Sequence, residues 1–96
     1  MKAAIKVNVV WSNEKIGRLP TSGSYATAAK FAEDADTWPR EGWSIVLEFQ
    51  PENAKARAFE AVARFLVPNA PWERLKTGCV FELYEGTRKT AMVTVL

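Results

Sequence analysis

The sequence contains no histidine and only one cysteine, Cys79, among its 96 residues. Without histidine the chain can build neither a Ser-His-Asp triad nor a Cys-His pair, and every metal site that requires an imidazole ligand is excluded. A single cysteine cannot form an internal disulfide, which is typical of proteins from reducing compartments. We therefore expect a cytoplasmic protein that holds no metal and performs none of the histidine-dependent hydrolytic reactions.

Long apolar runs and nucleotide-binding loops are also missing. No stretch approaches the roughly 18 uninterrupted apolar residues of a membrane-spanning helix, and neither GxxxxGK[ST] nor GxGxxG occurs. The 13 basic and 11 acidic residues leave a formal net charge of only +2, so charge alone identifies no partner. The sequence thus predicts no membrane association, no bound nucleotide and no cofactor.

Apolar and aromatic residues, in contrast, are plentiful. Hydrophobic residues make up 48% of the chain and aromatic residues 11%, including four tryptophans. This composition argues against disorder, and the length suits one modest hydrophobic core. We expect a single folded domain over residues 1–96 with a core rich in aromatic side chains.

Two segments alternate between apolar and polar residues with the two-residue period of a half-buried strand. The apolar positions of the first are Ile5, Val7, Val9 and Trp11, and those of the second are Trp43, Ile45, Leu47 and Phe49. Glycine and proline among polar residues predict loops at 12–24 and 33–42. Residues 25–32, YATAAKFA, are compatible with a short helix or an irregular strand, and we favour the strand.

The segment PENAKARAFEAVARFLVP, residues 51–68, supports two interpretations. A helix is favoured by good helix-forming residues and by the helical spacing of Ala54, Ala58, Ala61, Val62, Phe65 and Leu66. A strand would instead place one set of apolar residues on a common face, namely Phe59, Ala61, Ala63, Phe65 and Val67. The residue pattern taken alone favours the helix.

Residues 78–96, GCVFELYEGTRKTAMVTVL, form two apolar ribbons that meet at a charged tip. Gly86 lets the chain turn at this tip, where a side chain would be strained. The pattern predicts a β-hairpin with inward side chains from Cys79, Phe81, Leu83, Ala91, Val93 and Val95.

The C-terminal third resembles the third domain of elongation factor Tu, and still more the small free-standing bacterial proteins that carry only that domain. The matching positions are Phe65, Leu66, Gly78, Phe81, Leu83, Glu85, Gly86, Arg88, Val93 and Val95. Towards the N-terminus the similarity weakens, and Ala26 and Thr27 stand where the factor has arginine and proline. The resemblance implies an all-β fold, a small six-stranded antiparallel β-barrel. It also implies that Phe59 to Val67 is a strand, which reverses the preference for a helix.

The candidate contact residues come from the hairpin tip and from two loops. Glu85, Gly86, Thr87 and Arg88 match the tip that lies against the T stem of transfer RNA in the elongation factor, although a charged turn needs no ligand. Trp11 and Trp43 fall in inward registers, whereas Trp38 and Trp72 stand beside prolines in loops. The predicted partner-binding set is Trp38, Trp72, Glu85, Gly86, Thr87, Arg88 and Lys89, at one end of the barrel.

The resemblance implies a non-catalytic binding module, since the chemistry of the elongation factor resides in a separate GTPase domain. Its partner would be a protein or an RNA, bound through barrel loops by a monomer or weak homodimer. An alternative is an immunity or antitoxin-like inhibitor that neutralises a toxin by mimicking part of a translation factor. An enzyme is the third and least favoured class, because no paired-carboxylate or nucleophile motif occurs.

Overall fold

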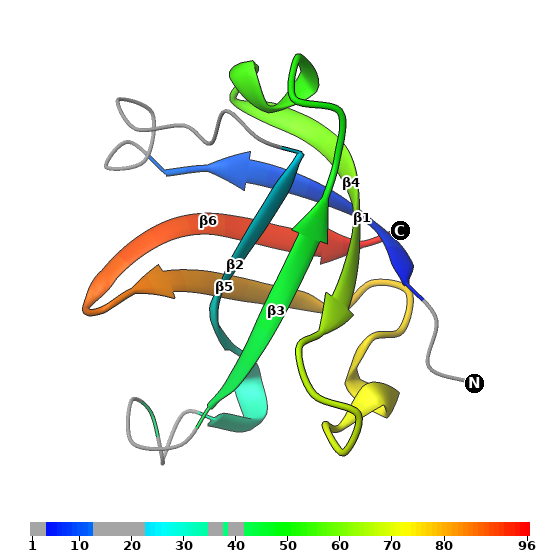
Figure 1. Ribbon diagram of the computed structural model, residues 1–96. Helices are drawn as coiled ribbons and strands as arrows, with labels where there is room; N and C mark the ends of the chain where they lie inside the picture. Colours follow the sequence, from blue (N-terminus) through cyan, green and yellow to red (C-terminus); the bar gives the residue numbers. More distant parts are fainter. Residues whose placement is uncertain (1–3, 13–22, 35–37, 39–41) are drawn as a thin grey trace.

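The computed structural model describes residues 4–12, 23–34, 38 and 42–96. Its strands are β1 (Ile5–Trp11), β2 (Ser24–Lys30), β3 (Trp43–Glu48), β4 (Ala58–Phe65), β5 (Val80–Glu85) and β6 (Arg88–Val95). They close into a barrel in the order β1-β4-β3-β2-β5-β6, and every neighbouring pair is antiparallel. The protein is therefore an all-β, six-stranded antiparallel barrel, which confirms the predicted fold class (Figure 1).

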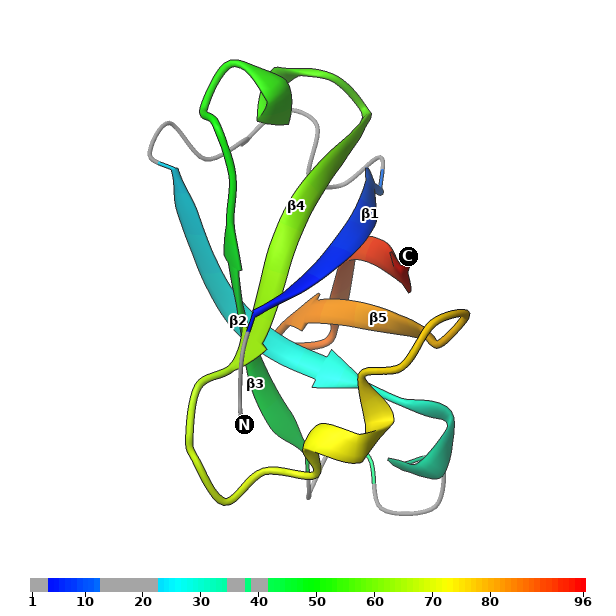
Figure 2. The same ribbon diagram turned by 90° about the vertical axis from the view of Figure 1, so that its right-hand side faces the viewer.

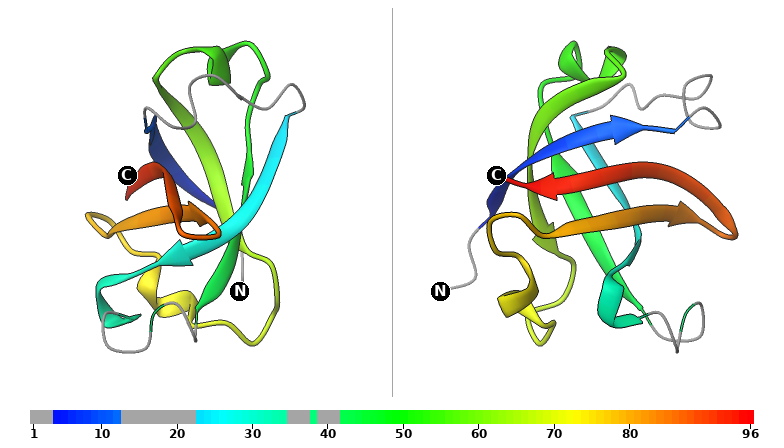
Figure 3. Two further views of the ribbon diagram at one scale, coloured as in Figure 1. Left: turned by 90° about the vertical axis from the view of Figure 1, so that its left-hand side faces the viewer. Right: turned by 180° about the vertical axis from the view of Figure 1, so that it is seen from behind.

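The barrel is flattened into two layers of strands that cross each other. β1, β6 and β5 lie side by side in one layer, and β2, β3 and β4 run across them in the other (Figure 3, right). The overall dimensions of 32 × 30 × 22 Å agree with this flattening. The described connections contain three short 3-10 turns, η1 (Ala32–Asp34), η2 (Asn53–Lys55) and η3 (Trp72–Arg74). No described segment is a helix long and apolar enough to cross a membrane.

The turn between β5 and β6 lies far from the connection between β4 and β5. The turn projects on the left of Figure 1, whereas residues 66–79 lie at the lower right. Figure 2 shows the same residues 66–79 in front of the barrel. Because β5 runs from one to the other, they stand at opposite ends of a single strand.

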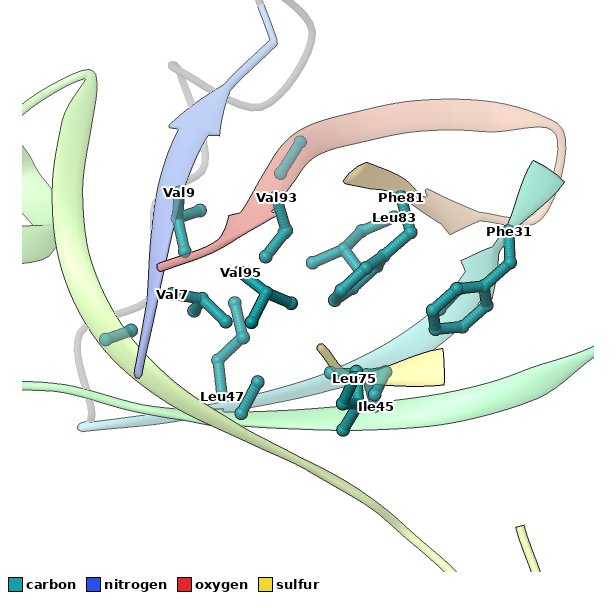
Figure 4. Packing of buried hydrophobic residues seen from close by; sticks show 14 of the residues in the cluster. Val7, Val9, Phe31, Ile45, Leu47, Leu75, Phe81, Leu83, Val93 and Val95 are labelled. Carbon is teal, nitrogen blue, oxygen red and sulfur yellow. The ribbon is translucent and has the colours of Figure 1, made fainter. Parts of the chain in front are cut away.

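Alternate side chains from both layers fill the interior of the barrel (Figure 4). Phe31, just after β2, stacks on Phe81 of β5 with ring centroids 4.6 Å apart. Full burial of an apolar side chain of this size contributes about 1.5–3 kcal/mol. Most of the predicted core is confirmed, because the buried set includes Val7, Val9, Trp11, Ile45, Leu47, Phe65, Phe81, Leu83, Ala91, Val93 and Val95. Ile5, Trp43 and Phe49 were also predicted to face inward, and they are only partly buried against this core. Cys79 is half-buried and packs against the edge of this core.

β4 is extended, so the helix favoured by the local pattern is wrong and the strand implied by the resemblance is confirmed as far as Phe65. The strand was predicted to continue to Val67, but that residue lies beyond its end and is 38% exposed. β4 is hydrogen-bonded to β1 on one side and to β3 on the other. Its inward residues alternate between large and small, in the order Phe59, Ala61, Ala63 and Phe65. Two ladders of backbone hydrogen bonds and burial of every second side chain outweigh the helix propensity of alanine.

The structure tests some of the remaining predicted strands and loops, and others lie outside the described residues. β2 confirms the strand preferred for YATAAKFA, and η1 begins where that strand has ended. Most of the first predicted loop, residues 13–22, lies outside the described residues, as do 35–37 and 39–41 of the second. At the hairpin tip Gly86 has φ +64°, the left-handed conformation that glycine adopts without a steric penalty.

Candidate binding surface on the hairpin

Trp38 lies across the outer side of the β5–β6 hairpin, far in sequence from the residues it touches. Its ring packs against that of Tyr84 with centroids 5.2 Å apart and planes inclined at 50°. Gly42 lies under the same indole, because a Cβ added at Gly42 would stand 2.7 Å from Cζ3 of Trp38. The absence of a side chain at Gly42 therefore leaves the room that the indole occupies, and Trp38 remains half-buried at the surface.

Tyr84 connects the indole to a charged pair on the hairpin. Its hydroxyl donates to Oε1 of Glu82 at 3.2 Å, and Lys89 Nζ lies 3.1 Å from Oε2 of the same carboxylate. Tyr84 and Lys89 are cross-strand partners in the β5–β6 ladder. Burial raises the pKa of Tyr84, and the neighbouring Glu82 carboxylate raises that pKa further. An aromatic pair and an ammonium group thus lie next to each other on one outer face.

Side-chain hydrogen bonds from β2 hold the hairpin close to its tip. The hydroxyl of Tyr25 donates to Oε2 of Glu85 at 2.5 Å and lies 3.0 Å from Oγ1 of Thr90. Thr27 donates to the carbonyl oxygen of Tyr84. Burial, followed by the hydrogen bond to Glu85, raises the pKa of Tyr25 to about 12, so its hydroxyl keeps its proton at neutral pH. These bonds attach the tip end of the hairpin to β2.

A register shift in the ladder strengthens this attachment. Leu83 pairs with Ala91 and Tyr84 with Lys89, which leaves Thr90 as an extra residue in β6. Thr90 is fully buried, and its hydroxyl donates to the carbonyl oxygen of Leu83 at 3.3 Å. A bulge of this kind bends the strand locally and increases its twist.

Trp72 occupies a different part of the molecule. Its ring packs edge-on against Phe65 at 5.3 Å, and its indole N–H donates to the carbonyl oxygen of Pro68 at 3.0 Å. Nearby, Arg74 forms a partly buried ion pair with Asp34 at 3.1 Å and lies 5.4 Å from the centroid of the Phe31 ring. Trp72 therefore helps to close the barrel beside the ion pair that joins the β2–β3 and β4–β5 connections.

The structure brings part of the predicted set together and leaves one member apart. Trp38 lies against Tyr84, directly beside the tip, and Thr87 and Arg88 are exposed on that tip. Trp72 lies in the connection that leads into β5, at the strand end opposite the tip. We use the name hairpin surface for Trp38, Tyr84, Glu85, Gly86, Thr87, Arg88 and Lys89.

Tyr84 was not among the predicted contact residues, although the sequence contains a signal for it. Once Phe81 and Leu83 are assigned to the interior, strand alternation turns Glu82 and Tyr84 outward. The contact between Trp38 and Tyr84 could not be predicted, because nothing in the local sequence relates a residue of the β2–β3 connection to one in β5. The cation–aromatic combination on this surface suits stacking with planar groups and contact with acidic groups on a partner.

A hollow lies on another part of the barrel. It is an open groove of about 450 Å³ beneath the β3–β4 connection, lined by Lys6, Gly23, Glu48, Phe49, Gln50, Asn53, Glu60, Ala61 and Val62. Glu48 forms an ion pair with Arg64, in which Oε1 of Glu48 lies 3.7 Å from Nε of Arg64. Within the described part of the chain, no cluster of three or more potential ligands is placed to hold a metal ion.

Comparison with known proteins identifies no relative that could inform the role of this surface. No family model matches the chain, and no curated protein or solved structure matches it either.

Proposed function

We propose that this protein is a non-catalytic binding module, similar in architecture to the third domain of elongation factor Tu, that binds a protein or RNA partner through the hairpin surface. The observation that carries the proposal is the position of Trp38, an indole kept half-exposed against Tyr84 beside the tip. Large aromatic side chains at partly exposed positions dominate the energetics of many interfaces.

Two further features support binding at this surface. Arg88 is exposed on the tip and Lys89 is half-buried next to Tyr84, so basic groups flank the aromatic pair. The hydrogen bonds from Tyr25 and Thr27 hold the hairpin in one arrangement, which reduces the conformational entropy lost when a partner binds. Trp72 is replaced in the proposal by Tyr84, because its indole is already engaged with Phe65 and Pro68.

Affinity capture from a native lysate, with identification of both protein and RNA, supplies the partner for the test. Binding of that partner is then compared between the parent and Trp38→Ala. We expect Trp38→Ala to weaken binding by more than about 2 kcal/mol, as truncation of an aromatic anchor does. If the partner is RNA, Arg88→Ala should lower the slope of log affinity against log salt by about one unit. If the partner is a protein, the salt dependence should be modest.

Two exposed residues away from the hairpin serve as matched controls. Leu66→Ala removes an exposed apolar side chain just after the end of β4, and Lys55→Ala removes a cation from the β3–β4 connection. Both variants should bind as the parent does. The proposal fails if Trp38→Ala and Arg88→Ala remain folded and bind the captured partner as tightly as the parent.

A further inference from the structure

The connection between β2 and β3 contacts both faces of β5. Phe31, at the start of this connection, stacks inside the barrel on Phe81, the second residue of β5 (Figure 4). Trp38 comes later in the same connection and lies outside the barrel on Tyr84, the fifth residue of β5. Three residues of a strand span about 10 Å. The connection therefore leads from the core, near the start of β5, to the hairpin surface, near its end.

Asp34 stands between these two aromatic residues in the chain and is hydrogen-bonded to both. Its carboxylate oxygen Oδ2 accepts from the backbone N–H of Phe31 at 3.0 Å, and its own N–H donates to the carbonyl oxygen of Phe31 at 2.9 Å. The carbonyl oxygen of Asp34 accepts from the backbone N–H of Trp38 at 2.9 Å. Asp34 thus ties the backbone of Trp38 to that of a core residue.

Arg74 of η3, in the β4–β5 connection, holds the carboxylate of Asp34. Nη1 of Arg74 lies 3.1 Å from Oδ1, the other oxygen of that carboxylate. Only 7% of the Asp34 side chain and 19% of the Arg74 side chain are exposed. Figure 2 shows η1 and η3 at the same end of the barrel. At such low exposure, removal of one partner leaves the other charge poorly solvated, so the pair is costly to break.

We propose that Asp34 and Arg74 are positioning residues of the hairpin surface, and that their ion pair holds the indole of Trp38 against Tyr84. The two residues act through the backbone of Trp38 and not through contacts of their own with a partner. The inference rests on the proposed function, in which Trp38 is the aromatic anchor. It adds that the presentation of this anchor depends on an ion pair with the β4–β5 connection.

The two oxygens of the Asp34 carboxylate connect the ion pair to the turn. Oδ1 contacts Arg74, whereas Oδ2 accepts from the N–H of Phe31. When the guanidinium of Arg74 is removed, the carboxylate is stabilised by turning towards water, and this rotation breaks its bond to Phe31. η1 contains only three residues, and so short a 3-10 turn has little stability of its own. Loss of the bond therefore frees the segment that carries Trp38.

The fixed backbone of Trp38 complements the surface on which its indole rests. Tyr84 and Gly42 contact the ring, whereas Asp34 determines where the backbone of Trp38 lies. An indole with a free backbone samples several orientations and must be ordered when a partner binds, which lowers the affinity. Asp34 and Arg74 therefore remove part of this ordering cost in advance.

Nuclear Overhauser effects (NOEs) between the rings of Trp38 and Tyr84 test the inference on the full chain without a partner. The parent should show these NOEs, because the ring centroids are 5.2 Å apart. Arg74→Met keeps an apolar chain over Phe31 but removes the charge, and it should lose the NOEs and shift the indole N–H signal of Trp38. Asp34→Ala removes the acceptor itself and should do the same. Arg74→Lys should retain the NOEs, because a single nitrogen makes the contact.

Two control variants separate the position of Trp38 from general destabilisation. Val95→Ala removes part of a buried side chain, and Arg64→Ala breaks the ion pair with Glu48. Both should retain the NOEs of Trp38. The indole signal of Trp11, which lies in the core, reports in each variant that the barrel is folded.

A double-mutant cycle with the captured partner measures the consequence for binding. Arg74→Met should weaken binding at least about fivefold, and Arg74→Lys should bind as the parent does. Combined with Trp38→Ala, Arg74→Met should cause no further loss, because both substitutions act through the same indole.

Folded Arg74→Met or Asp34→Ala that keeps the NOEs between Trp38 and Tyr84 overturns the inference, and so does their loss in either control variant. Additive effects of Arg74→Met and Trp38→Ala in the cycle overturn it as well. A partner that binds Trp38→Ala as tightly as the parent refutes the proposed function instead. In that case the NOEs of the free protein still decide whether Asp34 and Arg74 position Trp38.

Discussion

Phe81 illustrates how single residues hold the barrel together. Its side chain is 1% exposed and stacks on Phe31, whose ring also lies beneath Arg74. Arg74 in turn pairs with Asp34, and a carboxylate oxygen of Asp34 accepts from the backbone N–H of Phe31 at 3.0 Å. A buried ion pair loses much solvation on folding, and this added hydrogen bond compensates part of that loss.

Truncation of Phe81 tests the core at the residue scale. Phe81→Ala should lower the free energy of unfolding by about 3–5 kcal/mol, because it removes a fully buried ring and leaves a cavity. Urea denaturation followed by circular dichroism measures the change. Val80→Ala alters the adjacent outward residue and should change stability by no more than about 0.5 kcal/mol. Equal effects of the two substitutions would show that Phe81 is not in the core.

Strand alternation allowed most of the buried side chains to be predicted from the sequence. Contacts between residues that are far apart in the sequence could not be predicted. The inward positions of β1, β3, β5 and β6 follow from a two-residue period. The pair of Asp34 with Arg74 joins residues 40 positions apart, and neither residue stands out locally from other charged loop residues. Contacts of this kind depend on the closed arrangement of the strands, which no single segment encodes.

At the scale of elements, β4 is the segment in which the tertiary structure overrides local preference. Its alanines favour a helix in isolation, yet inside the barrel they provide small inward side chains at Ala61 and Ala63. Large residues at both sites would crowd the interior between β1 and β3. The resemblance to a known barrel could correct this assignment, whereas residue pattern alone could not.

The hairpin turn depends on a backbone conformation that suits glycine. Gly86 has φ +64°, and an added Cβ would meet no atom within 4 Å, so any cost of substitution arises from the backbone. Gly86→Ala should destabilise the protein by about 1–2 kcal/mol. Gly86→Asn should cost less, because asparagine tolerates the left-handed region better than other residues. Thermal unfolding compares the stability of the two variants. A larger loss of stability for Gly86→Asn than for Gly86→Ala would contradict this account of the turn.

The attachment of the hairpin to β2 predicts a dependence on pH. Folding raises the pKa of Tyr25 from 10.0 to about 12, so the folded state favours the protonated hydroxyl. The protonated Tyr25 hydroxyl contributes fully to the free energy of unfolding below pH 10.0, and this contribution is lost as the pH rises through about 12. The difference in unfolding free energy between the parent and Tyr25→Phe should therefore shrink across this window. Urea titrations at several alkaline pH values measure it, and a constant difference would contradict the hydrogen bond to Glu85.

At the scale of the whole molecule, closure of the sheet places distant segments on common surfaces. The order β1-β4-β3-β2-β5-β6 brings β5 beside β2, and this is how Trp38 reaches Tyr84. The same closure separates Trp72 from the tip, although both were predicted at one end of the barrel. The individual candidate residues could be chosen from sequence, but their grouping required the register of all six strands.

The central claim, that the hairpin surface binds the partner, is tested most directly by the indole N–H signals of the four tryptophans. These signals are recorded by two-dimensional NMR while the captured partner is titrated into the labelled protein, and Trp38→Phe assigns one of them. We predict that the Trp38 signal and the backbone signals of residues 84–89 shift on binding, while Trp11, buried in the core, and Trp72, packed on Phe65, stay in place. Saturation of binding with the Trp38 and 84–89 signals unchanged would contradict the claim.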